Sequence, residues 1–139
     1  MDHPSAPAYV VVEHTADIAL RVSGRTLEEL FANAAAGMFA QMVVLDRVAP
    51  ALQRHVRVEE DDNEALLVAW LSELLYLRDV HGEAYSRFQV RFAAPRHLEA
   101  VAEGSPWTAF DRPVKAVTFH GLKVEPKDNG WQATIVFDV

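Results

Sequence analysis

Two segments of this sequence carry apolar residues at helical spacing, and they limit the folds that the chain can adopt. Thr26 with Glu29 three residues later forms a capping-box pattern, which predicts a helix that continues to Met42. A second helix is predicted from the acidic residues 61–64 to about Gly82. Each helix has a single apolar stripe, so the two together can cover one face of a sheet.

Most of the remaining apolar residues occur in short segments that alternate with polar residues or are rich in β-branched residues, as in strands. These predicted strands cover residues 8–12, 18–22, 54–59, 88–92, 97–102, 115–120, 122–125 and 131–139. The last two flank a turn at residues 127–130 and form a hairpin. Alternation is typical of a sheet with one exposed face and favours antiparallel pairing. The sequence therefore predicts an α+β two-layer sandwich, in which two amphipathic helices cover one face of a mainly antiparallel sheet.

The length and composition indicate one ordinary globular domain. A chain of 139 residues fits a single domain, which we expect to span residues 8–139 after a disordered extension at residues 1–7. With 13 basic and 20 acidic side chains, the net charge is −7, which is unfavourable for a free-standing nucleic-acid binder. The absence of cysteine excludes disulfides, thiolate metal sites and a cysteine nucleophile. No signal peptide or membrane-spanning segment is recognisable, so we expect a cytoplasmic protein without membrane association.

The densest polar group in the first part of the chain, residues 13–17 with the sequence E-H-T-A-D, lies between two predicted strands. Carboxylates at a strand break can offer oxygen ligands to Ca²⁺ or Mg²⁺. A turn in which Asp17 and Thr15 bind local backbone amides explains the same residues, and spacing alone favours the turn. The sequence ends in Asp138 and Val139, where two carboxylates repel each other unless solvent or a cation separates them.

Histidine and aspartate give two rival hypotheses. His14 and His120 could bind zinc or non-haem iron together with Asp17. Alternatively, a hydrolase could use Asp17 as a nucleophile or base with His14 as its partner. No serine lies in a G-x-S-x-G elbow, and the sequence has no glycine-rich phosphate loop. Residues 115–120 alternate, and a core strand whose lysine extends to solvent explains them without a functional role.

Three segments and the end of the sequence, taken together and in this order, resemble the archease family. The segments are residues 13–18 with the sequence EHTADI, residues 64–75 with their leucine-rich helical pattern, and residues 115–120 with the sequence KAVTFH. The acidic ending Asp138-Val139 completes the pattern, and the likeness extends over residues 9–139. Each motif alone is weak, but their combination, order and spacing are specific.

This resemblance implies a protein cofactor, rather than an enzyme, that activates the tRNA-splicing RNA ligase. That ligase joins a 2′,3′-cyclic phosphate or 3′-phosphate RNA end to a 5′-hydroxyl end, in tRNA splicing or RNA repair. Archeases promote guanylylation of the ligase and allow multiple turnover, so RNA would be contacted only through the ligase. Two alternatives remain open: a chaperone-like or methylation-modulating binding module, and a metal-dependent phosphoester hydrolase.

The resemblance also implies a bound divalent cation, which we expect to be Ca²⁺, with Mg²⁺ or Mn²⁺ as alternatives. Its ligands would be the side chains of Asp17 and Asp138 and a main-chain or terminal oxygen of Val139. Four further residues belong to the same motifs and would either lie near the ion or face the partner: Glu13, His14, Lys115 and His120.

Overall fold

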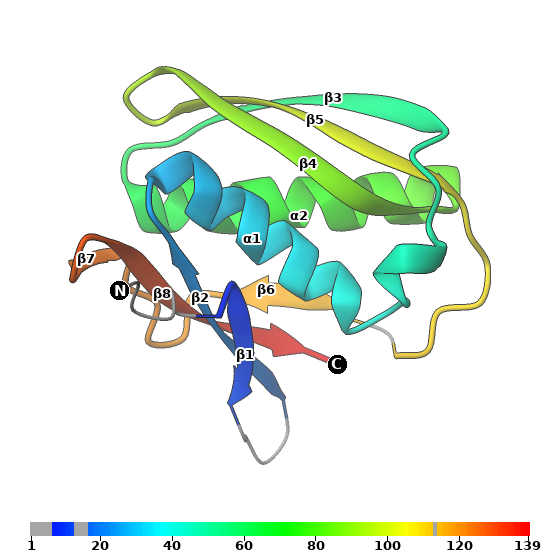
Figure 1. Ribbon diagram of the computed structural model, residues 1–139, viewed down its shortest axis with the longest axis horizontal. Coiled ribbons are helices and arrows are strands. Elements are labelled where there is room, and N and C mark those ends of the chain that lie inside the picture. Colours follow the sequence, from blue (N-terminus) through cyan, green and yellow to red (C-terminus); the bar gives the residue numbers. More distant parts are fainter. Residues whose placement is uncertain (1–6, 13–16, 113) are drawn as a thin grey trace, which may run out of the picture.

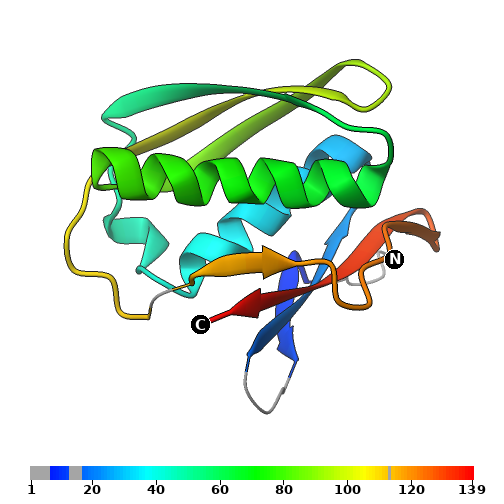
Figure 2. The same cartoon turned by 180° about the vertical axis from the view of Figure 1, so that it is seen from behind.

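The computed structural model describes residues 7–12, 17–112 and 114–139. Two helices lie between two antiparallel sheets, which gives the fold three layers (Figure 1, Figure 2). The extension predicted to be disordered, residues 1–7, lies outside the described residues except for Pro7. The single domain over residues 8–139 stays a prediction. The buried side chains of the elements described below form one hydrophobic core.

The helices are α1 (Leu27–Ala40) and α2 (Asn63–His81), and a short 3-10 helix, η1, spans Leu45–Arg47. The larger sheet contains β1 (Tyr9–Val12), β2 (Ile18–Gly24), β6 (Ala116–Thr118), β7 (Glu125–Lys127) and β8 (Gly130–Asp138). Its strand order is β1-β2-β8-β6, and β7 also pairs with β8. The smaller sheet contains β3 (Leu52–Glu59), β4 (Glu83–Ala94) and β5 (His97–Pro106), in the order β3-β5-β4.

The predicted α+β class, the antiparallel pairing and the two helices are confirmed, and the strands divide between two sheets instead of forming one. Helix α1 contacts β2 and β4, and helix α2 contacts β3 and β6, so each helix packs on both sheets. The width of the apolar stripes explains this arrangement, because a stripe two residues wide can face two layers. In α2 the buried residues occur in neighbouring pairs: Leu66 and Leu67, Trp70 and Leu71, Leu74 and Leu75.

Capping contacts confirm the predicted starts of both helices and the end of α2, whereas α1 ends at Ala40, before the predicted Met42. The hydroxyl of Thr26 accepts a hydrogen bond from the backbone N–H of Glu29 at 3.1 Å. A carboxylate oxygen of Asp62 accepts one from the backbone N–H of Ala65 at 2.7 Å. Gly82 ends α2 with a φ of 64°, a left-handed conformation that favours glycine. These caps determine where α2 ends and therefore where β4 begins.

The smaller sheet buries one charged residue. Glu83 is only 4 % exposed, and Arg54 donates hydrogen bonds to its two carboxylate oxygens at 2.9 and 2.7 Å. The hydroxyl of Tyr85 donates to the same carboxylate at 2.7 Å. The hydrogen bonds from Arg54 hold the pKa of Glu83 below its ordinary value, and burial raises the pKa of Tyr85. This group ties β3 to β4 across the intervening strand β5.

Candidate functional site

The pairing of β2 with β8 brings two aspartates from distant parts of the sequence to the same end of the larger sheet. Ile18, the first residue of β2, pairs with Phe137 of β8. Asp17 immediately precedes Ile18, and Asp138 immediately follows Phe137. Because the strands are antiparallel, the two aspartates lie on neighbouring strands at one sheet end. Asp17 of the E-H-T-A-D segment and Asp138 of the acidic ending thus belong to one part of the fold.

The side chain of Asp138 points away from the helices. Phe137 is fully buried in the core between the sheets, and successive side chains of a strand point to opposite faces. Asp138 is accordingly exposed, and Asp17 is partly exposed. Oxygen atoms at this sheet end are therefore accessible to a hydrated cation or to a partner.

Strand β6 holds Asp138 from its other side. Ala116 pairs with Asp138, and the backbone N–H of Lys115 donates to the carbonyl oxygen of Asp138 at 2.8 Å. The structure therefore places the backbone of Lys115 next to Asp138. Val139 follows Asp138 directly and is 37 % exposed.

His120 is not brought to the aspartates. Strand β6 runs from Ala116 beside Asp138 to Thr118 beside Val136, so residues after Thr118 lie progressively farther from Asp138. The backbone N–H of His120 donates to the hydroxyl of Thr118 at 3.3 Å in the turn that follows the strand. Glu13 and His14 lie outside the described residues. A zinc or iron site that joins His120 to Asp17 is thus unsupported by the register.

The donor chemistry at this sheet end fits a hard cation. Among residues 7–12, 17–112 and 114–139, no group of three or more histidine, aspartate or glutamate side chains could hold a metal ion. What the sheet end offers is two aspartate carboxylates and the main-chain oxygens that follow Asp138. Calcium and magnesium prefer such oxygen ligands, whereas structural zinc sites use nitrogen and sulfur. A cation bound here would need further oxygen ligands from water or from a partner.

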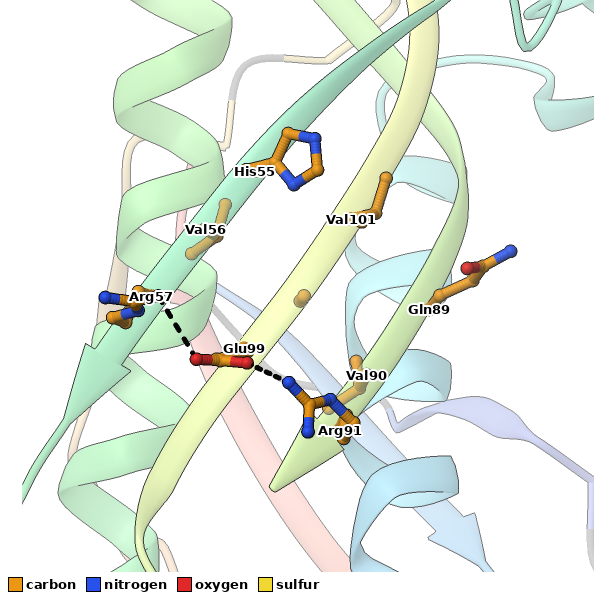
Figure 3. A pocket seen from close by; sticks show the side chains of 9 residues that line it. His55, Val56, Arg57, Gln89, Val90, Arg91, Glu99 and Val101 are labelled. Carbon is orange, nitrogen blue, oxygen red and sulfur yellow. Dashed lines mark hydrogen bonds and ion pairs between the residues drawn. The ribbon is translucent and has the colours of Figure 1, made fainter. Parts of the chain in front are cut away.

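A second cluster of charges lies on the outer face of the smaller sheet (Figure 3). The carboxylate of Glu99 binds Arg57 at 3.2 Å and also pairs with Arg91, so Glu99 bridges the two arginines. They border a depression of about 520 Å³ whose lining includes His55 and Gln89. This depression lies on the smaller sheet, whereas the aspartates lie at the larger sheet. Because its charges already pair with one another through Glu99, we assign no ligand to it.

The part of the chain that the structure describes contains no helix long and apolar enough to cross a membrane.

Comparison with known proteins gives one consistent result. Residues 9–139 match the sequence profile of the Archease protein family (MTH1598/TM1083). Protein archease of Methanosarcina mazei is 37% identical, in an alignment that covers 94% of this chain and 95% of the relative. Protein archease of Thermococcus kodakarensis is 41% identical and covers 91% of this chain and 95% of the relative.

Two solved structures share the fold. The solution structure of Methanobacterium thermoautotrophicum protein 1598 superposes with a TM-score of 0.83 at 32% identity, and it covers 95% of this chain and 99% of that chain. The crystal structure of a Thermotoga maritima archease, described as a possible chaperone, has a TM-score of 0.63 at 23% identity over the full length of both chains. The second likeness concerns the fold alone.

Proposed function

The chain belongs to the archease family, and from this membership we propose that it is an activating cofactor of the tRNA-splicing RNA ligase. In this role it promotes guanylylation of the ligase and repeated joining of 2′,3′-cyclic phosphate or 3′-phosphate ends to 5′-hydroxyl ends. It catalyses no reaction of its own and contacts RNA only through the ligase. The observation that carries this proposal is the family match over residues 9–139, which includes the segments containing both aspartates.

We propose that the working end of the protein is the sheet end formed by Asp17, Asp138 and Val139. The two aspartate side chains and a main-chain oxygen of Val139 would hold a divalent cation, with Ca²⁺ expected first and Mg²⁺ or Mn²⁺ as alternatives. When bound, the cation offsets the repulsion between the carboxylates and keeps coordination positions open to a partner. The adjacency of β2 and β8 supports this assignment because it puts the two carboxylate-bearing residues at one end of the sheet.

The charge of the protein supports docking on a basic partner. Its net charge is −7, and the proposed working end exposes acidic groups. An RNA ligase must present a basic surface to bind its substrate, so opposite charges would steer the two proteins together. Association should therefore weaken as the salt concentration rises.

The decisive experiment measures ligation turnover by the cognate ligase with GTP and a divalent metal, with and without this protein. We expect several rounds of joining per ligase molecule only when the protein is present. The protein alone should release no product from a phosphoester substrate. Absence of stimulation would contradict the proposal and favour the binding-module hypothesis, whereas hydrolysis by the protein alone would favour the hydrolase hypothesis.

Extending the chain beyond Val139 should weaken cation binding. A peptide added there crowds the exposed end of β8 beside the main-chain oxygens of Val139. We expect Ca²⁺ affinity, measured by isothermal titration calorimetry, to fall by about tenfold or more, as when the surroundings of metal ligands are perturbed. The control carries the same peptide at the N-terminus and should bind like the unmodified protein. Equal affinity in the two tagged forms would contradict the role of Val139.

A further inference from the structure

One arginine between the two sheets contacts the backbone that supports the proposed working end. Arg78 lies in the last turn of α2, and its side chain is only 12 % exposed. Helix α2 and strand β6 lie side by side (Figure 2). Arg78 contacts Val114, which lies two residues before β6. A guanidinium that is buried to this extent needs several partners to offset its loss of hydration.

The guanidinium of Arg78 is held by four groups. Its Nη1 donates to the carbonyl oxygen of Val114 at 2.7 Å and contacts the sulfur of Met42 at 3.0 Å. Its Nε donates to the carboxylate of Asp79 at 2.8 Å. The ring of Phe110 lies under the guanidinium, with 5.9 Å between the guanidinium carbon and the ring centroid. The orientation of this side chain is therefore fixed, and one of its hydrogen bonds is donated to the backbone just before β6.

The peptide group that joins Val114 to Lys115 is hydrogen bonded at both of its ends. Its oxygen accepts the bond from Arg78, and its N–H donates to the carbonyl oxygen of Asp138 at 2.8 Å. A positive charge at the oxygen of a peptide group polarises that group and strengthens the bond that its N–H donates. The charge of Arg78 thus acts on Asp138 through a single rigid peptide plane.

The carbonyl oxygen of Asp138, which accepts this hydrogen bond, belongs to the peptide group that joins Asp138 to Val139. Because a peptide group is planar, fixing this carbonyl fixes the plane from which Val139 continues. The same bond secures β8 to the short strand β6 beside the aspartate side chain. We infer that Arg78 is a positioning residue, which orients Asp138 and Val139 for the cation through the Val114–Lys115 peptide group. This inference rests on the proposed function of that sheet end.

The test compares two arginine-to-methionine variants of the full chain. Arg78→Met keeps an apolar stem between Met42 and Phe110 but loses the bond to Val114. Arg54→Met removes an equal charge from the smaller sheet, on which the aspartates do not lie. Three quantities are measured for each: the melting temperature, the Ca²⁺ dissociation constant by calorimetry, and the hydrogen-exchange rate of the Lys115 amide.

We expect Arg78→Met to weaken Ca²⁺ binding by about tenfold or more, as is usual when a group supporting metal ligands is removed. The Lys115 amide should exchange faster in this variant. Arg54→Met should lower the melting temperature at least as much, yet keep its Ca²⁺ dissociation constant within about twofold of the unmodified protein, because distant sites act independently. The inference would be overturned if Ca²⁺ affinity fell in both variants in proportion to the loss of melting temperature. It would also be overturned if Arg78→Met bound Ca²⁺ as tightly as the unmodified protein. Absence of Ca²⁺ binding by the unmodified protein would instead contradict the proposed cation site itself.

Discussion

Replacing Asp17 with alanine is expected to reduce ligation turnover to the level of the ligase without this protein. Asp17 supplies one of the two side-chain carboxylates at the proposed working end, beside the first pair of β2 and β8. Asp138 alone would leave a divalent cation with too few protein ligands, since Ca²⁺ takes roughly six to eight oxygens. The measurement is the number of RNA joints formed per ligase molecule at a fixed ratio of the two proteins.

Two further variants make this result specific. Asp17→Asn keeps the shape of the side chain but removes its charge, so it should fail as Asp17→Ala does. Glu125→Ala removes a carboxylate from the same sheet at the exposed strand β7, which pairs with β8 far from Asp138, and it should stimulate normally. Full stimulation by Asp17→Ala would keep the cofactor role but discard the account based on the cation. Loss of stimulation in Glu125→Ala would indicate that overall charge, not the site, matters.

Replacing Arg54 with methionine is expected to lower the melting temperature by roughly 10 °C at neutral pH. The substitution removes the cation that pairs with the buried carboxylate of Glu83 and leaves the hydrogen bond from Tyr85. The loss should depend on pH. In the unmodified protein the pKa of Glu83 is lowered on folding, so the pair contributes stability above the unfolded pKa and loses it as the pH falls through the folded value. In the variant, the charged form of Glu83 is buried without Arg54 and is therefore unfavourable, so protonation of Glu83 removes the cost of the buried charge. The difference between the two proteins should therefore shrink as the pH falls below 4.5, the ordinary pKa of a glutamate.

The matched control is Arg57→Met, on the same strand as Arg54. Arg57 is 82 % exposed and pairs with Glu99 on the outer face of the smaller sheet. Exposed ion pairs contribute little to stability, so its melting temperature should stay close to that of the unmodified protein at every pH. Thermal unfolding followed by circular dichroism compares all three proteins. Equal losses in both variants would show that burial of Glu83 is not the cause.

The elements of this fold could be predicted from the sequence, but their division into two sheets could not. Thr26 and Gly82 mark helix ends through local contacts, which depend on residues close in sequence. Alternation, in contrast, shows that a strand has one buried face without showing against which layer it packs. Phe92 of the smaller sheet and Phe137 of the larger sheet lie in runs of the same kind. β4 also begins earlier than predicted, because Glu83 is a buried charge that interrupts the apolar pattern.

For the candidate site, the motifs named two acidic segments, and the pairing of β2 with β8 brings Asp17 and Asp138 to one end of the larger sheet. The proximity of Asp17 to Asp138 depends on pairing between the second strand and the last, which no spacing rule reveals. His120 and Lys115 belong to the same sequence motif, yet they lie beyond opposite ends of strand β6. Arg78 gave no signal, because a basic residue in the last turn of a helix is ordinarily explained by the helix dipole.

The position of β8 has a consequence for how the protein acquires its working end during synthesis. β8 follows every other element along the chain, yet it pairs with β2, β6 and β7 and so connects most of the larger sheet. The smaller sheet joins strands that emerge from the ribosome earlier and can pair before β8 exists. Asp17 emerges well before Asp138, so the two can lie together only after β8 is made, and such distant pairing is slow. A chain cut short before Gly130 would lack β8, so it could not present the pair of aspartates to a ligase.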